Sequence, residues 1–95
     1  MAYQVKFEEK AKADFAKLDN SVKIKILKYL KKIEERDDPR TLGEELAENL
    51  AGYWRYRVGD FRLIAEIQDD VFVVLMLVID KRATVYKIAA KRLAK

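Results

Sequence analysis

The spacing of apolar residues changes near Gly52, and this change divides the chain into two kinds of structure. Before Gly52, apolar residues recur three or four positions apart, as they do on one face of an α-helix. After it, apolar and polar residues alternate, so Trp54, Tyr56 and Val58 are expected on one face of a strand. Helical spacing followed by strand spacing predicts an α+β fold, with helices packed on a sheet.

The first half of the chain predicts one short strand and two helices. Residues 3–7 alternate between polar and apolar, which indicates a strand. Residues 8–18 and then 22–33 have helical spacing, and residues 19–21 are polar side chains suited to capping the second helix. The only proline, Pro39, ends this αα-hairpin, and a polar connection follows with Leu42 and Leu46 as anchors.

The second half predicts three strands and a short helix. Gly59-Asp60 is a turn that joins the strand after Gly52 to a second strand, Phe61–Ile67. The apolar run Val71–Ile79 predicts a strand buried on both faces, and residues 82–95 contain a short amphipathic helix. The expected order is βααβββ with a C-terminal helix. We expect a mainly antiparallel sheet of about four strands, with residues 1–95 forming a single domain.

The composition excludes several kinds of chemistry. The chain has no cysteine and no histidine, which removes thiolate nucleophiles, disulfides and the commonest general acid–base. The absence of cysteine fits a reducing cytoplasm, the location we expect. The longest apolar run has nine residues, whereas a membrane-spanning helix needs about 20, so no membrane is expected as a partner.

Positive charge is concentrated in the second half of the chain. Residues 1–50 hold eleven Lys or Arg and eleven Asp or Glu, whereas residues 51–95 hold nine and five. The whole net charge of +4 therefore belongs to the predicted strands and the terminal helix. A localised excess of this kind is typical of a surface that binds a polyanion.

Three arginines are expected on one polar face of the strand hairpin. Arg55 and Arg57 share a face of the first strand, and Arg62 lies just across the turn, within about 5–8 Å by strand pairing. Arginine stays charged and grips phosphate oxygens in a bidentate manner, so this cluster indicates a phosphate site. The end of the last strand adds Lys81 and Arg82.

An aromatic residue, Tyr86, follows these basic residues and suits stacking on an unpaired RNA base. For each of these residues a purely structural role also stays open. Asp60 and Glu66 are carboxylates that would pair with the arginines, and Tyr86 would then be a half-buried packing residue. Trp54 and Tyr56, by their alternation, are expected in the core rather than on an RNA-binding surface.

The run Gly52–Leu63, with the sequence GYWRYRVGDFRL, resembles the sheet core of RelE-type toxins in the RelE/ParE superfamily. The segment Asp80–Tyr86 is similar to their last strand and terminal segment, and the opening Met1–Tyr3 also fits. The resemblance covers essentially the whole chain. The same fold occurs in ParE-type toxins, which act on DNA gyrase.

The resemblance implies an mRNA endoribonuclease that works in the ribosomal A site, without metal or cofactor. The ribose 2′-OH attacks the neighbouring phosphate and leaves a 2′,3′-cyclic phosphate and a 5′-OH. The implied partners are mRNA, the ribosome with its 16S rRNA, and a cognate RelB-like antitoxin. The family's functional positions fall on five residues of this chain, with Lys81 adjacent to them: Arg55, Arg57, Arg62, Arg82 and Tyr86.

The chain departs from the best-known RelE toxin at the alternating strand pair, which is lysine there and arginine here. A guanidinium is a poor proton acceptor, so Arg57 and Arg62 are expected to hold the phosphate. Arg82 is then expected to stabilise the transition state.

Tyr86 is expected to stack the base or orient the nucleotide, while Arg55 and Lys81 bind RNA. The proton acceptor stays open between Glu66 and a ribosomal group. Two other functions stay open as well: inhibition of gyrase by a ParE-like toxin, and a non-catalytic domain that only binds its antitoxin.

Overall fold

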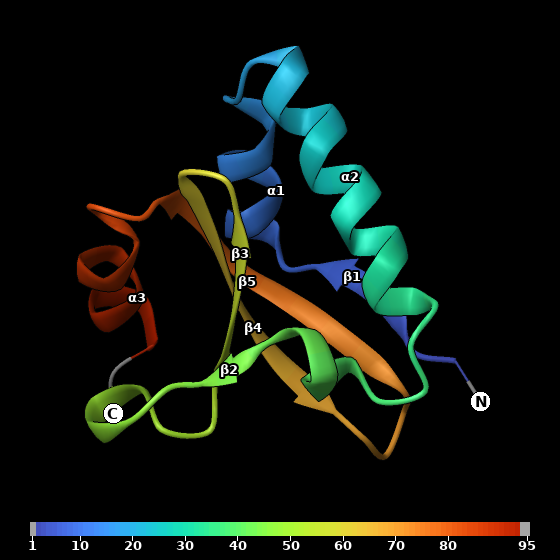
Figure 1. Cartoon of the computed structure of the whole chain (residues 1–95). Coiled ribbons are helices and arrows are strands. Elements are labelled where there is room, and N and C mark those ends of the chain that lie inside the picture. The colour runs from blue at the N-terminus through green and yellow to red at the C-terminus, as the bar shows by residue number, and fades with distance from the viewer. Residues whose placement is uncertain (1, 94–95) are drawn as a thin grey trace.

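The computed structural model describes residues 2–93 and contains a five-stranded mixed sheet with helices on both faces (Figure 1). The strand order is β1-β5-β4-β3-β2, and only the β1–β5 pair is parallel. Two short 3₁₀ helices, Pro39–Leu42 and Glu48–Leu50, flank β2. The elements are β1 (Gln4–Phe7), α1 (Glu9–Ala16), α2 (Asn20–Glu34), β2 (Glu44–Glu45), β3 (Trp54–Val58), β4 (Phe61–Gln68), β5 (Val73–Lys81) and α3 (Val85–Leu93).

Two apolar layers hold the sheet between its helices. On one face, Ile26, Leu30 and Ile33 of α2 pack with buried residues of β3, β4 and β5. On the other face, Val85 and Ala89 of α3 pack with a second set from β4, β5 and the Glu48–Leu50 turn. Full burial of one large aliphatic side chain contributes about 1.5–3 kcal/mol, so each helix is held mainly by its apolar stripe.

The side chains of β3 alternate between the two faces of the sheet, as predicted. Tyr56 is fully buried toward α2, and its hydroxyl donates a hydrogen bond to the Pro39 carbonyl (2.8 Å). Gly43 lies against the Tyr56 ring, where an added Cβ would be 2.9 Å from the ring atom Cε1. The pleat therefore buries the tyrosine on one side and places Arg55 and Arg57 on the side of α3.

β5 extends further than its neighbour β1, the edge strand, and α1 supplies the missing hydrogen-bond partner. β1 ends at Phe7, which pairs with Met76. Beyond that point the Ile79 N–H donates to the Asp14 carboxylate (3.1 Å). Arg92 of α3 grips the same carboxylate through both terminal nitrogens at 2.9 Å. One carboxylate thus connects α1, β5 and α3.

The predicted fold class is confirmed, with one strand more than expected. β2 has only two residues, both acidic, so no alternation in the sequence indicates it. The predicted anchors Leu42 and Leu46 do pack, one against each apolar layer. Residues 19–21 were expected to cap α2 through side chains, but Asp19 is the N-cap residue and makes no such bond.

No helix within residues 2–93 combines the length and the apolar character needed to cross a bilayer.

Candidate phosphate-binding site

Strand pairing brings Arg57 and Arg62 together on the α3 face of the sheet. Arg57 lies directly opposite Arg62 in the β3–β4 hairpin, and Arg55 lies opposite Ile64. Side chains at directly opposite positions have Cβ atoms about 4.5–5.5 Å apart, and like charges there repel. An anion between these guanidiniums would relieve the repulsion, so the hairpin favours anion binding.

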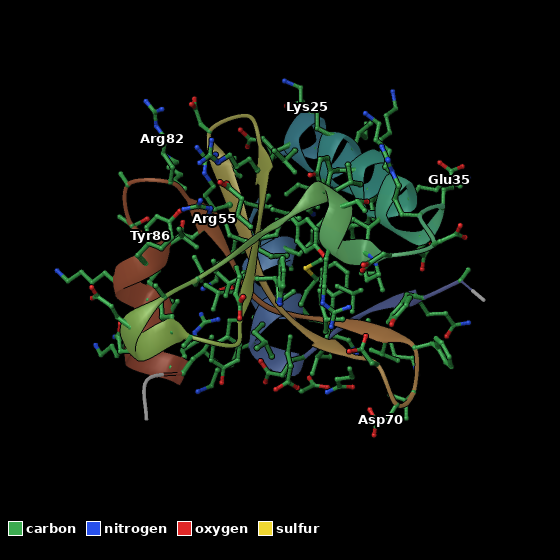
Figure 2. The ribbon with its side chains drawn as sticks, turned by 60° about the horizontal axis from the view of Figure 1, so that its bottom comes forward. Lys25, Glu35, Arg55, Asp70, Arg82 and Tyr86 are labelled. Carbon is green, nitrogen blue, oxygen red and sulfur yellow. The ribbon has the colours of Figure 1, made fainter. Side chains whose placement is uncertain are left out.

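The end of β5 delivers Lys81 and Arg82 to the same end of the sheet. Lys81 pairs with Phe61, and the Arg82 N–H donates to the carbonyl of Asp60 at the hairpin turn (2.8 Å). Both side chains are exposed. Figure 2 shows Arg82, Arg55 and Tyr86 on one side of the molecule, next to α3.

Arg55 is committed to partners within the chain. Its Nη1 donates to the Tyr86 hydroxyl (2.8 Å), its Nη2 donates to Glu44 Oε1 (2.7 Å), and its guanidinium carbon lies 5.8 Å from the centre of the Tyr86 ring. These contacts, with Tyr86 first, raise the pKa of Arg55. Its Nε is buried without a partner among the described residues. Arg55 therefore holds the side chains of Tyr86 and Glu44 in place, and it is less exposed than Arg57.

Glu44 is a site residue that the sequence did not indicate. The same oxygen that accepts from Arg55 lies 3.0 Å from Nη2 of Arg57. The hydrogen bond from Arg55, followed by the charges of Arg55, Arg57 and Arg62, lowers the pKa of the Glu44 carboxyl. β2 places Glu44 opposite Arg55, and this pairing between distant segments has no local signal in the sequence.

The two carboxylates expected to pair with the arginines do not do so in the structure. Glu66 accepts a hydrogen bond from Gln68 (2.7 Å) and lies four residues along β4 from Arg62, about 13 Å at the usual strand rise. Asp60 contributes its backbone carbonyl to Arg82. Glu66 is thus remote from the arginines. The carboxylate that contacts them is that of Glu44.

Arg62 and Arg82 form no direct ion pair with a carboxylate among residues 2–93. Nη1 of Arg62 donates to the carbonyls of Gly59 (2.8 Å) and Phe61 (2.9 Å), which orients the guanidinium over the turn. Asp80 lies opposite Arg62, and its Oδ1 accepts the N–H of Lys81 (2.7 Å). Within residues 2–93, no carboxylate oxygen lies within 4.0 Å of the guanidinium nitrogens of Arg62 or Arg82.

The arrangement suits a phosphodiester with charge developing on its oxygens. Arg57, Arg62 and Arg82 come from three strand ends around one hairpin, and guanidiniums bind phosphate oxygens with paired hydrogen bonds. Tyr86 lies half-buried beside them, and its hydroxyl oxygen accepts from Arg55 while its own proton stays available to a ligand. The site therefore combines fixed positive charge, the carboxylates of Glu44 and Asp80, and one aromatic ring.

Comparison with known proteins gives consistent matches over most of the chain. The family described as the ParE toxin of the type II toxin–antitoxin system parDE matches residues 5–86. The chain is 31% identical to the toxin RelG of Mycobacterium tuberculosis, covering 92% of this chain and 99% of that protein. It is also 31% identical to a putative RelE-like toxin protein of Escherichia coli, covering 98% and 99%.

The fold has a matching solved structure, the toxin–antitoxin complex RelBE2 of Mycobacterium tuberculosis. The TM-score is 0.79 at 28% sequence identity, and the match covers 86% of this chain and 100% of that one. The arginine cluster thus lies on a framework shared with a protein solved beside its antitoxin.

Proposed function

Because this chain belongs to the RelE/ParE superfamily of toxins from type II toxin–antitoxin systems, we propose that it is a ribosome-dependent mRNA endoribonuclease. One observation carries the proposal. Arg57 and Arg62 lie opposite each other on the β3–β4 hairpin, and the backbone of Arg82 is hydrogen-bonded to the hairpin turn. Among residues 2–93, neither Arg62 nor Arg82 has a carboxylate oxygen within 4.0 Å, so both guanidiniums are available to a phosphodiester.

The reaction is an internal transesterification of RNA. The ribose 2′-oxygen forms a bond to the adjacent phosphorus as the bond from phosphorus to the 5′-oxygen breaks. The products are a 2′,3′-cyclic phosphate and a 5′-OH, so one proton leaves the 2′-OH and one is taken up by the 5′-oxygen. Arg57 and Arg62 hold the non-bridging oxygens, and Arg82 stabilises the charge that grows on the phosphate and the leaving oxygen.

Glu44 takes the proton of the 2′-OH in this proposal. It is the carboxylate in contact with the arginine cluster, and guanidiniums do not accept protons at neutral pH. Its lowered pKa keeps it ionised at neutral pH, although it also makes the carboxylate a weak base. Precise positioning by the ribosome would then supply much of the acceleration.

Tyr86 orients the nucleotide, and Arg55 and Lys81 support the RNA around it. Arg55 holds the Tyr86 hydroxyl, so the ring has one defined position against which a base can stack. Lys81 is exposed and precedes Arg82, but it pairs with Phe61, so its side chain leaves β5 on the face opposite that of Arg62. Its role in this proposal is to contact a phosphate that passes the end of the strand. These three residues act on binding geometry rather than on the breaking bond.

A reconstituted translation reaction tests the proposal. Purified protein should cut translated mRNA with codon phasing and leave 2′,3′-cyclic phosphate and 5′-OH ends. Arg82→Ala should lose about two to three orders of magnitude in cutting rate, as when one donor to a developing oxyanion is removed, while its thermal unfolding is unchanged. Arg36→Ala removes an exposed arginine far from the hairpin and should cut normally. Intact message under the wild-type protein would refute ribonuclease activity.

The family match also supports a second candidate, a ParE-like toxin that inhibits DNA gyrase by binding. The description of the matching family names the ParE toxin, and the match covers residues 5–86. A gyrase inhibitor would block supercoiling and leave mRNA intact. A non-catalytic domain would do neither, and its expression would cause no growth arrest.

A RelB-like antitoxin is the proposed regulator of the toxin. The Mycobacterium tuberculosis chain with the same fold was solved in a toxin–antitoxin complex, which supports an antitoxin partner for this chain. The basic arginine cluster adds an electrostatic reason, since an acidic segment laid over it would block RNA.

A further inference from the structure

A small cavity lies between the first turns of α2 and the β3–β4 turn. Val58 and Phe61 form the strand pair next to that turn, and Arg57 and Arg62 form the following pair. Because side chains alternate along a strand, the two pairs leave the sheet on opposite faces. The volume of the cavity is about 140 Å³, and its lining residues are Val22, Lys25, Val58, Gly59, Asp60 and Phe61.

The turn that lines the cavity also contacts the phosphate site. The carbonyl of Gly59 accepts a hydrogen bond from Nη1 of Arg62 (2.8 Å), and the carbonyl of Asp60 accepts from the backbone N–H of Arg82 (2.8 Å). Figure 2 shows Lys25 and Arg82 at the same end of the molecule, with the yellow β3–β4 turn between them. A nucleotide whose phosphate is held by Arg62 therefore has the cavity beside it.

The two charged residues of the cavity have opposite signs and do not pair with each other. Both Lys25 and Asp60 are exposed. Among residues 2–93, neither side chain has an oppositely charged group within 4.0 Å. A second phosphate would be repelled by Asp60, so the cavity suits a neutral ligand that offers hydrogen-bond donors to the carboxylate and acceptors to the ammonium group.

The size and the walls of the cavity suit a single nucleobase. Pockets for drug-sized ligands have volumes of about 300 Å³ or more, so 140 Å³ has room for one planar ring system. Val22, Val58 and Phe61 are half-buried and give the cavity apolar walls. Bases stack on aromatic rings in many single-stranded nucleic-acid sites, and Phe61 offers such a ring.

Guanine is the base that matches the two charged groups best. Its N1–H and N2–H₂ donors lie side by side and can both reach one carboxylate, whereas its O6 and N7 are acceptors for an ammonium group. Adenine and cytosine offer a carboxylate one amino group, and uracil offers one N–H. Each of these bases would leave one oxygen of the carboxylate without a base contact.

We propose that this cavity binds the guanine base of a nucleotide whose phosphate is held by the arginines. The carboxylate of Asp60 accepts from N1–H and N2–H₂, Lys25 donates to O6 or N7, and the ring of Phe61 packs on the base. Lys81 pairs with Phe61 and leaves β5 on the same face, where it contacts the backbone of the bound strand. That the nucleotide belongs to mRNA rests on the function proposed above, whereas the recognition of guanine does not.

Binding of uncleavable oligonucleotides tests this proposal. Fluorescent hexanucleotides with 2′-deoxy sugars carry uracil at every position but one, which is guanine, adenine, cytosine or hypoxanthine. Hypoxanthine is guanine without the N2 amino group. Wild-type protein should bind the guanine hexamer about tenfold more tightly than the other three. Asp60→Asn should lose this preference, while its affinity for every hexamer stays equal or rises, because a negative charge beside the arginines is removed.

Each variant has a matched control, and circular dichroism checks that every protein is folded. Glu66→Gln removes the same charge as Asp60→Asn from a place remote from the arginines and should keep the guanine preference. Lys25→Ala should reduce the preference by at least about threefold, because it removes a charged donor. Lys28→Ala removes a lysine of the same helix that does not line the cavity, and it should keep the preference.

Equal affinity of the wild type for the four hexamers would overturn the proposal, as would a guanine preference that survives in Asp60→Asn. Competition with guanosine 5′-monophosphate distinguishes the source of the base. Displacement of the guanine hexamer supports a free nucleotide as ligand, and no displacement supports RNA. The hexamers contain no 2′-OH, so the test does not depend on cutting. A guanine preference in a protein that leaves translated mRNA intact would refute the ribonuclease and support the base site.

Discussion

At the scale of single residues, the site depends on an unequal distribution of partners among its arginines. Glu44 compensates Arg55 and Arg57. Backbone carbonyls hold the guanidinium of Arg62, whereas Arg82 is anchored through its own backbone N–H. Arg62 is oriented by turn carbonyls, which fix a guanidinium without neutralising it. The proposed phosphate site therefore has two guanidiniums without a direct ion pair, beside the carboxylates of Glu44 and Asp80.

Glu44→Gln separates the role of a base from that of a counter-charge. The amide cannot accept the 2′-OH proton, so the single-turnover cutting rate should fall by about two to four orders of magnitude. Binding of mRNA with a 2′-deoxy residue at the cut site should stay equal or tighten, because Arg57 is released from its partner. A variant that cuts at the wild-type rate would leave Glu44 with a purely electrostatic role.

If Glu44 is the base of the proposed reaction, the wild-type protein should show the matching pH dependence. The pKa of Glu44 is lowered, so the carboxylate is ionised at neutral pH and cutting falls only as the pH drops through that lowered value. Glu44→Asp should retain this acid limb, and Glu44→Gln should lose it. Measuring the rate in the same buffer series for all three proteins checks the assignment.

At the scale of elements, the Asp14–Arg92 pair connects helices on opposite faces of the sheet. Its side chains are only 15% and 22% exposed, and Asp14 also accepts the N–H of Ile79. Tyr86 lies near the start of α3. Because the Asp14–Arg92 pair holds α3 in place, it also helps to position Tyr86 in the site. The lengths of β1 and β5 make this possible, since β1 ends before Ile79 and leaves its N–H to α1.

Asp14→Ala should lower the free energy of unfolding by about 2–3 kcal/mol, because it leaves Arg92 and the Ile79 N–H without their partner in a mostly buried place. Urea unfolding measures the change. Glu9→Ala is the control, since its contact with Lys12 is 3.8 Å long and exposed and contributes less than about 1 kcal/mol. Similar losses in both variants would contradict the role given to Asp14.

At the scale of the whole molecule, one polar network joins three segments that are far apart in the sequence. The Tyr3 hydroxyl donates to Asp69, and Arg40 grips the same carboxylate with contacts of 3.1 and 2.6 Å. Arg40 also lies over the Trp54 ring at 5.7 Å. The segment before β1, the 3₁₀ helix after α2 and the β4–β5 turn thus meet at one carboxylate.

This network predicts a loss of stability in acid. Arg40, followed by Tyr3, lowers the pKa of Asp69, so its contribution to stability is present above the ordinary aspartate value and is lost as the pH falls through the lowered value. Unfolding midpoints in urea at neutral pH and about one unit below the ordinary pKa of about 3.9 measure this loss. Asp69→Asn should be less stable at neutral pH and should lose less on acidification. An unchanged acid loss in the variant would assign it to other carboxylates.

Local patterns in the sequence predict the helices and every strand except β2, and they also predict the part of the site that lies on the β3–β4 hairpin. Alternation in β3 is a property of the backbone pleat, and Arg62 follows Arg57 across a turn of only two residues, so both positions depend on neighbours in the chain. The contacts of the arginine cluster with distant segments follow only from the packing of the fold. A two-residue strand places Glu44, and a carbonyl of the hairpin holds the backbone of Arg82. An apolar groove lined in part by Val5 and Leu27 exists because α2 packs beside the edge strand β1. Contacts of this kind depend on register and packing between distant segments, and no short-range pattern encodes them.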